Sequence, residues 1–398
     1  MEEKIINREN STDIKITNKK LIYQLNLFTG EAEPVPIEIL REPEEGQEIF
    51  VDEGIYLVKT GDISQIIISG FGIYLSKKSE RLLVKQAGKA IYEFPLFRIS
   101  EIIIASKGIS LSSDLISELC QRGIRLSFLS GNGKPYAMIS SPMLTATVIS
   151  RREQILAIND QRGLEFSKII VMGKIKNQEK LLRYFGKYLK HSSPERFNTI
   201  NQIADRLQAI QRKVKSIKGQ NIHEARDILN GIEGTSGRLY WNGVKEIISQ
   251  KVEFFGRIRH HALDEVNSLL NYGYGILYST VWGAIMNAGL EPFAGFLHTD
   301  RPGKPSLVLD LVEEFRQPVV DRVVISHINL GSAIKVKDGL LDAETRKIIG
   351  EKILERLDST AIFEGKNYKI RSIIQLQARN LSAFLRGEKP YKCYSFKW

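Results

Sequence analysis

The texture of the chain changes near Thr145, and this change constrains the fold more than any other feature. Between residues 63 and about 139, short apolar and β-branched runs such as Gln65-Ile66-Ile67-Ile68-Ser69 alternate with turn residues, as in strands. After Thr145, long segments repeat apolar residues at helical spacing, with breakers such as Pro194 between them. We predict an α+β protein, with a small β-rich, sandwich-like N-terminal domain followed by a larger all-α domain.

The same patterns divide the chain into three parts. Residues 1–62 contain prolines and many acids and are treated as an N-terminal extension or small added module, with one or two strands around Phe28-Thr29-Gly30. Residues 63–144 form the β-rich domain, and residues 145–398 form the helical domain with a C-terminal tail. The spacing predicts helices over residues 113–120, 148–190, 196–217, 222–255, 262–288, 306–325, 342–358 and 368–386.

The net charge indicates a polyanionic partner. The chain of 398 residues carries +11 at pH 7, but residues 1–66 hold 14 acids and 7 bases. Residues 67–398 therefore carry +18, which favours nucleic acid first and a membrane surface second. No apolar run reaches the roughly 18 residues that a membrane-spanning helix needs, so the membrane interpretation weakens. A basic but merely solvated surface is the alternative.

Cysteine usage and the first residues favour the cytoplasm. Cys120 and Cys393 are the two cysteines, too few for a disulfide framework or a cysteine-rich zinc site, and a reducing compartment fits them. The polar residues Met1-Glu2-Glu3-Lys4 do not lead into an apolar core, so we expect no signal peptide.

Three distant segments place an acid or an imidazole beside apolar residues. They contain Glu233, His298, and the run with Asp310, Glu313 and Glu314. A buried carboxylate is costly unless something compensates it, and one divalent cation shared by Glu233, His298 and Glu313 would compensate all three. Two carboxylates and an imidazole suit Mg²⁺ or Mn²⁺, with zinc as the alternative metal.

Each of these residues also has a structural interpretation. The acids of 310–314 could form a solvated helix face paired with Arg316 or Arg322, and Glu233 could pair with Arg238. A lone histidine is more often a hydrogen-bonded structural residue than a ligand. His298, however, precedes Asp310 by twelve positions, and a loop of this length can fold back so that the imidazole meets the start of that helix.

Basic and aromatic residues near these segments are candidates for DNA contacts. Arg238 and Tyr240 lie five and seven positions after Glu233 and could contact a phosphate. Lys174 and Lys176 could line a phosphate track. The tail after residue 390 mixes bases with aromatics, and either contacts nucleic-acid bases or tucks into a groove of its own protein.

The chain resembles the CRISPR-associated spacer-acquisition integrases, metal-dependent enzymes that insert captured DNA fragments into a CRISPR array. The resemblance covers about residues 65–385 and leaves residues 1–62 outside. Four motifs stand in order at family spacing, and a segment at Lys174-Ile175-Lys176-Asn177-Gln178 matches as well. The four motifs are Gly231-Ile232-Glu233-Gly234 with Arg238 and Tyr240; residues 264–274; Ala288-Gly289-Leu290-Glu291-Pro292 leading to Gly295-Phe296-Leu297-His298; and residues 306–316.

The resemblance implies a fold, a site and partners. The β-rich domain would dimerise and the helical domain would be catalytic, with a metal held by Glu233, His298 and Glu313 and with Asp310 as an auxiliary acid. The activity implied is DNA integration and endonuclease cleavage in antiviral defence. It would act on double-stranded DNA, both the incoming fragment and the CRISPR repeat, with a small partner protein bridging homodimers and no membrane. The alternatives are a non-catalytic DNA-binding scaffold and a metal-dependent nuclease acting on RNA or branched DNA.

Overall fold

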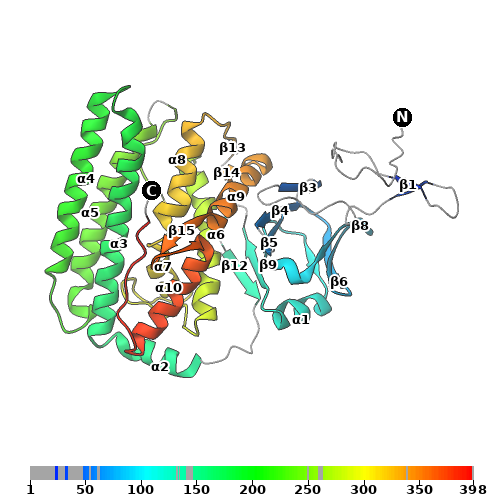
Figure 1. The fold of residues 1–398 in the computed structure, drawn as a ribbon, viewed down its shortest axis with the longest axis horizontal. Coiled ribbons are helices and arrows are strands. Elements are labelled where there is room, and N and C mark those ends of the chain that lie inside the picture. Colours follow the sequence, from blue (N-terminus) through cyan, green and yellow to red (C-terminus); the bar gives the residue numbers. More distant parts are fainter. Residues whose placement is uncertain are drawn as a thin grey trace.

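A computed structural model describes residues 23–25, 32–34, 48–52, 55–60, 63–130, 133, 135–139, 147–248, 251–258, 263–337 and 339–396. In Figure 1 the two larger sheets lie on one side of the molecule and the long helices α3, α4 and α5 on the other. The predicted α+β order, with a smaller β-rich part followed by a larger helical part, is confirmed. No helix in the described ranges combines the length and the apolar character that crossing a membrane requires.

Two sheets build the β-rich part, and one helix, α1 (Ser113–Gln121), packs beside them. The larger sheet contains, in spatial order, β12 (Pro135–Ile139), β11 (Arg125–Leu129), β9 (Ile99–Ile104), β5 (Ile63–Ile68), β4 (Ile55–Thr60) and β3 (Glu48–Asp52). The smaller sheet contains β10 (Ser110–Leu111), β6 (Ile73–Lys78), β7 (Arg81–Gln86) and β8 (Lys89–Pro95), with the short helix η2 (Leu96–Arg98) leading on to β9.

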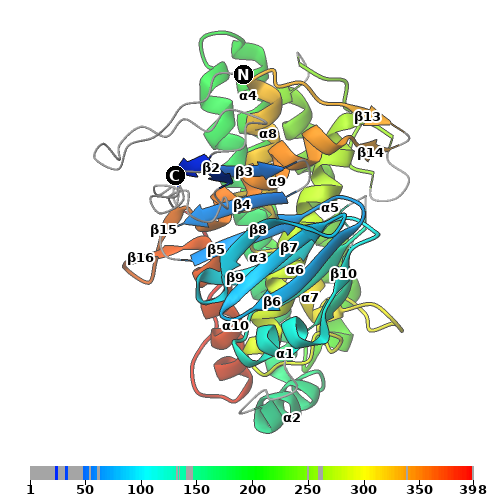
Figure 2. The same ribbon diagram turned by 90° about the vertical axis from the view of Figure 1, so that its right-hand side faces the viewer.

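The larger sheet is covered on both faces, which explains its runs of consecutive isoleucines. Its central strands β5, β9 and β11 are parallel. Successive side chains of a strand point to opposite faces. Ile66 and Ile68 enter the core shared with the smaller sheet, whereas Ile67 and Ile103 enter the core of the helical part. A parallel sheet buried on both faces needs such near-continuous apolar strands. Figure 2 looks onto the smaller sheet, with the helical part behind it.

The helical part surrounds α6 (Glu265–Asn287), most of whose residues are buried. Asp264 caps its N-terminus by accepting from the Asn267 backbone N–H. The remaining helices are α2 (Thr147–Ala157), α3 (Gln161–Gly186), η3 (Lys187–Leu189), α4 (Pro194–Lys215), α5 (Ile222–Ile248), α7 (Ser306–Val312), the π-helix η4 (Arg316–Asp321), α8 (Arg322–Asn329), α9 (Ala343–Asp358) and α10 (Ile370–Leu385).

Helix α6 also joins the two parts. Arg125 of β11 donates from Nη1 to the Thr280 carbonyl oxygen at 3.0 Å, and Ser279 Oγ donates to Ser127 Oγ at 2.6 Å. A methyl group at Gly275 would lie 1.5 Å from the Gly133 carbonyl oxygen, so the backbones approach this closely only because neither residue has a side chain. The β-rich part is therefore packed directly onto the central helix.

The structure differs from the sequence predictions at several boundaries. Strands β3 and β4, which lie within the predicted extension, pair in the larger sheet of the β-rich part. The described fragments of the extension also include β1 (Tyr23–Leu25) paired with β2 (Ala32–Pro34). The hairpins β13 (Val336–Lys337) with β14 (Leu340–Leu341) and β15 (Thr360–Phe363) with β16 (Lys366–Lys369) were not predicted.

Two predicted helices are interrupted for identifiable reasons. The segment 148–190 breaks between α2 and α3, where the side chain of Asp160 caps α3 by accepting from the Arg162 backbone N–H at 2.8 Å. The segment 306–325 is divided into α7, η4 and α8. Pro318 lies inside η4, and its missing N–H prevents a regular helical ladder there. Glu313, Glu314 and Arg316 lie at this irregular turn, a kind of position often found at functional sites.

Candidate active site

Two of the predicted acids meet at one buried cation. Lys174 of α3 forms an ion pair with Oε1 of Glu233 from α5, and its Nζ lies 2.7 Å from Oε2 of Glu313, which follows α7. The side chains of Lys174 and Glu313 are 7% and 3% exposed, and that of Glu233 is 20% exposed. Three separate helical elements thus converge on the Lys174 ammonium. Glu233 forms its ion pair with Lys174 and not with Arg238, the partner considered from the sequence.

Positive charge around Glu313 keeps it ionised despite its burial. Burial alone would raise the pKa of this carboxyl group. The charges of Arg316, Lys174 and His298 outweigh burial and bring the pKa to about 2. Arg316 Nε lies 3.3 Å from Glu313 Oε1, one helical turn away.

Asp310 fixes both the loop before α7 and the ring of His298. Its Oδ2 accepts from the backbone N–H groups of Phe296 and Leu297 at 2.7 and 3.1 Å. Its Oδ1 accepts from the His298 backbone N–H at 2.9 Å and contacts the ring Nδ1 at 2.7 Å. Asp310 is 0% exposed. Both oxygens are committed to the 296–298 loop, so its geometry is that of a positioning residue.

This contact also sets the tautomer of His298. A carboxylate oxygen only accepts hydrogen bonds, so the proton must reside on Nδ1. When the ring is neutral, the lone pair is therefore on Nε2, the nitrogen left to bind a ligand. Metal-ligating histidines commonly carry such a carboxylate partner on the other ring nitrogen. The side chain of His298 is 23% exposed, which leaves it accessible from solvent.

The donor types fit a divalent cation, but Lys174 stands between two of them. Among the residues that the structure describes, no three histidine, cysteine, aspartate or glutamate side chains enclose a position for a metal ion. Glu233 and Glu313 already share a cation, the Lys174 ammonium, and His298 contacts Asp310 through the other ring nitrogen, Nδ1. Carboxylate oxygens and an imidazole nitrogen are ligand types that Mg²⁺ and Mn²⁺ accept, so these three side chains are the candidates to hold such an ion.

Behind Arg316 lies a buried cluster of Asp321, Tyr240 and Tyr274, and the Tyr274 ring packs against the Arg316 guanidinium. Asp321 is 0% exposed and accepts from the Tyr240 and Tyr274 hydroxyls, the former at 2.7 Å. Burial raises the pKa of the Asp321 carboxyl group, although both tyrosine hydrogen bonds lower it. The Arg316 guanidinium lies 4.7 Å from the centroid of the Tyr274 ring. Sequence reasoning missed Asp321 and Tyr274, because nothing in the local pattern links positions so far apart.

The neighbouring Glu314 anchors the C-terminal segment, defined here as residues 387–396. Its carboxylate accepts from the Tyr391 hydroxyl, from Gln377 Nε2 at 2.7 Å and from the Tyr394 backbone N–H at 2.9 Å. Burial raises its pKa to about 7, against the opposing effect of these hydrogen bonds. Phe315 stacks on Tyr394 with ring centroids 5.5 Å apart. The tail therefore tucks into its own protein, one of the two predicted possibilities.

The predicted DNA contacts separate into two groups. Lys176 and Arg238 are exposed, and Arg238 donates to Thr235 Oγ1 at 3.2 Å. Tyr240, by contrast, is 0% exposed and its hydroxyl donates to Asp321. Lys174 is buried in its ion pairs. In this structure Tyr240 offers no surface to a phosphate, because its position in α5 faces the core.

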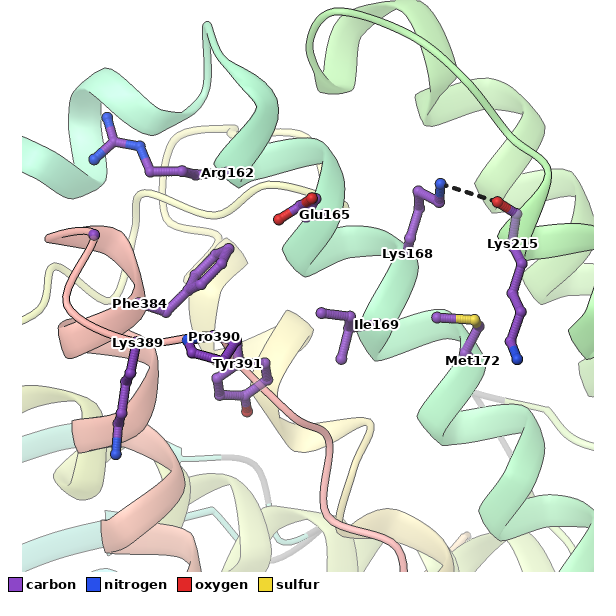
Figure 3. A pocket seen from close by; sticks show the side chains of 11 residues that line it. Arg162, Glu165, Lys168, Ile169, Met172, Lys215, Phe384, Lys389, Pro390 and Tyr391 are labelled. Atoms are coloured by element: carbon purple, nitrogen blue, oxygen red, sulfur yellow. Dashed lines mark hydrogen bonds between the residues drawn. The ribbon is translucent and has the colours of Figure 1, made fainter.

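A cavity of about 470 Å³ lies elsewhere along α3, between this helix and the C-terminal segment (Figure 3). Lys168 and Lys215 lie on one side of it, and Phe384, Lys389 and Tyr391 on the other. Lys168 donates to the backbone carbonyl oxygens of Lys215 and Ile217, at 3.3 and 2.6 Å. Tyr391 of the tail lines this cavity, whereas Glu233, His298, Asp310 and Glu313 do not.

Comparison with known proteins agrees with the resemblance found in the sequence. The family described as CRISPR associated protein Cas1 matches residues 66–354. A curated relative from Francisella tularensis subsp. novicida, named CRISPR-associated endonuclease Cas1 1, is 40% identical over 336 residues. That match covers 84% of this chain and 100% of the relative.

Solved structures support the same fold. A casposase bound to its integration product has a TM-score of 0.69 at 25% identity, covering 82% of this chain and 92% of that one. The chain of a Cas6-RT-Cas1–Cas2 complex also has a TM-score of 0.69, at 20% identity, covering 93% of this chain and 38% of that one.

Proposed function

The chain belongs to the Cas1 family of CRISPR-associated endonucleases and integrases, and from this premise we propose a specific activity. It inserts short DNA fragments into a CRISPR array by metal-assisted phosphoryl transfer, in antiviral defence. One observation carries the proposal: Glu233 and Glu313 converge from separate helical elements on a single buried cation. Asp310, at the start of the same acidic segment, orients the ring of His298. An integration product bound to the similar casposase supports joining chemistry for this architecture.

Each residue of the centre has a role in this proposal. Glu233, Glu313 and the Nε2 of His298 would hold Mg²⁺ or Mn²⁺. When bound, the cation polarises the phosphate under attack and favours the deprotonated form of the attacking hydroxyl. Asp310 keeps the imidazole in the ligating tautomer. Arg316 compensates the charge of Glu313. Arg238 and Lys176 bind phosphates of the DNA on the exposed side.

The reaction follows from which nucleophile enters. A 3′-hydroxyl of the incoming fragment loses its proton and attacks a phosphodiester of the repeat. The new P–O bond joins the fragment to the 5′-phosphate side of the cut strand. The bond from phosphorus to the original 3′-oxygen breaks, and that oxygen takes up a proton and leaves as a free 3′-hydroxyl. Water in the same position cuts the strand, so endonuclease activity accompanies integration. We further propose a homodimer in the cytoplasm and a small partner protein. A solved complex that contains both Cas1 and Cas2 supports such a partner.

The test measures joining of a labelled duplex fragment to a plasmid that carries a repeat. We expect Glu233→Ala and His298→Ala to reduce joining and cleavage by at least about 100-fold, while thermal unfolding stays cooperative. EDTA should abolish both reactions, and added Mn²⁺ should restore them. Arg301→Ala, a change of an exposed residue in the loop after His298, serves as the control.

The same assay separates the alternatives. Wild-type joining that persists in EDTA, or full activity in either alanine variant, would reject this ligand set and leave a DNA-binding scaffold as the interpretation. Preferential cleavage of RNA or of branched DNA, without joining, would instead indicate a different nuclease.

A further inference from the structure

The position of Lys174 between Glu233 and Glu313 affects how a metal ion could bind to these two carboxylates. Lysine is almost never fully buried unless its charge is paired. Here the pair is double, because one ammonium lies against Glu233 Oε1 and 2.7 Å from Glu313 Oε2. The two acids come from different helical elements, so without this cation their like charges would face each other in a poorly solvated space.

The ammonium and a divalent cation require the same oxygen atoms. Mg²⁺ binds carboxylate oxygens at about 2.0–2.1 Å, in near-octahedral geometry. A metal ligated by Glu233 Oε1 and Glu313 Oε2 would lie between these oxygens, where Lys174 Nζ now lies. Two cations with a total charge of +3 at such a short separation repel strongly in a buried setting. Occupation by the metal and by the ammonium therefore exclude each other.

Lysine suits such an exchange better than arginine. Its charge sits on a flexible four-carbon stem and binds as a point, whereas arginine forms rigid bidentate pairs. Arg316 remains beside Glu313 on its other oxygen, at 3.3 Å, so Glu313 keeps one positive neighbour when Lys174 moves away. The displaced ammonium stays within one side-chain length of the centre, where a DNA phosphate would bring new negative charge.

Building on the proposed function, we propose that Lys174 is the resident counter-ion of the metal-free centre. Its ammonium stabilises Glu233 and Glu313 before loading, competes with the divalent cation for their oxygens, and on displacement becomes available to a phosphate of bound DNA. Lys174 is thus a positioning residue that links metal entry to phosphate binding. The buried ion pair and the predicted phosphate contact describe two states of one side chain.

The experiment measures Mn²⁺ binding to the full chain without DNA, by electron paramagnetic resonance of free Mn²⁺. Lys174→Met removes the competing cation, and we expect the Mn²⁺ dissociation constant to fall about tenfold, comparable to losing one charged contact. Without metal, Lys174→Met should unfold at a lower temperature than wild type, and Mn²⁺ should raise its unfolding temperature by more. Lys176→Met, an exposed change on the same helix, should leave Mn²⁺ affinity unaltered.

Two further variants keep the outcome clear. Lys174→Arg retains the charge and should bind Mn²⁺ no more tightly than wild type. Lys174→Gln keeps a hydrogen-bond donor without charge and replaces Lys174→Met if that variant does not fold, with the same tighter binding expected. Unchanged or weaker Mn²⁺ binding in the uncharged variants would overturn the counter-ion role. If instead wild type and Glu233→Ala bind Mn²⁺ equally, the metal centre itself is misassigned, and the proposed function fails first.

Discussion

Asp310 binds His298 twice through a single oxygen: Oδ1 accepts from the backbone N–H at 2.9 Å and from the ring Nδ1 at 2.7 Å. The ring is thereby oriented by the same carboxylate that closes the loop before α7. The position of Nε2 depends on this one buried side chain, which makes Asp310 the residue to test after the ligands themselves.

Replacing Asp310 by asparagine should impair the centre without removing a ligand. The amide nitrogen cannot accept, so at least one of the four donors around Asp310 loses its partner, and the tautomer of His298 is no longer fixed. We expect DNA joining to fall by about 10–100-fold and the free energy of unfolding to fall by about 1–3 kcal/mol. Asp300→Asn, in the same loop but with no contact to His298, is the matched control for the joining assay.

The pKa of Glu313 predicts how stability depends on acidity. Its pKa in the folded protein is about 2, below the ordinary value of 4.5, so the stabilisation is present above about pH 4.5 and is lost as the pH falls toward 2. The effect amounts to roughly 3 kcal/mol at most. Urea unfolding of Arg316→Met should show a smaller loss over this interval, since the pKa of Glu313 then lies closer to 4.5. The exposed change Arg301→Met should behave like wild type, and an identical acid response in both variants would contradict the assignment.

The pKa of Glu314 predicts the opposite slope in another interval. Its folded-state pKa is about 7, above 4.5, so its contribution is present below about pH 4.5 and is lost as the pH rises through 7. Glu314→Gln cannot ionise and should show less decline in unfolding free energy between pH 5 and 8. Glu344→Gln makes the same change in charge at an exposed side chain and should retain the wild-type slope. Equal slopes in all three proteins would refute this prediction.

Tyr240 and Arg238 give a matched pair for the proposed DNA contacts. Tyr240→Phe removes a buried hydrogen bond to Asp321 and should cost about 1–3 kcal/mol of unfolding free energy, with unchanged DNA affinity at fixed salt. Arg238→Ala should weaken DNA binding and make it less dependent on salt. Its free energy of unfolding should change by less than about 0.5 kcal/mol. Fluorescence anisotropy at several salt concentrations measures both affinities. Loss of DNA affinity in Tyr240→Phe with native stability would show that the tyrosine reaches a phosphate after all.

Sequence patterns predicted the order of the parts because apolar spacing is a local property. The isoleucine run 66–68 and the long α3 periodicity each depend on neighbours a few positions away. Boundaries failed where one residue decided the outcome, as with the Asp160 cap and Pro318 in η4. The short hairpin β15–β16 carries too few residues to rise above the surrounding helical signal.

For the candidate site, sequence patterns identified acids and an imidazole but could not pair them. Glu233 and Lys174 are 59 positions apart, and their contact follows from how α3 and α5 pack. The burial of Tyr240 is equally a tertiary property, because Arg238, two positions earlier, is exposed on the same helix. Tyr240 was predicted to contact a phosphate because it follows Glu233 closely in the sequence. Its side chain is buried, so it does not make that contact in this structure.

The larger sheet, with Ile66 and Ile68 on one face and Ile67 and Ile103 on the other, has a mechanical consequence. A hinge motion between strands and helices would pull Ile67 and Ile103 into water, and this loss of apolar burial opposes such a motion. In a dimer formed through the strands, the separation of the two catalytic centres would then be set at assembly. The length of DNA between two insertion points would be measured by the shape of the protein and not by its motion.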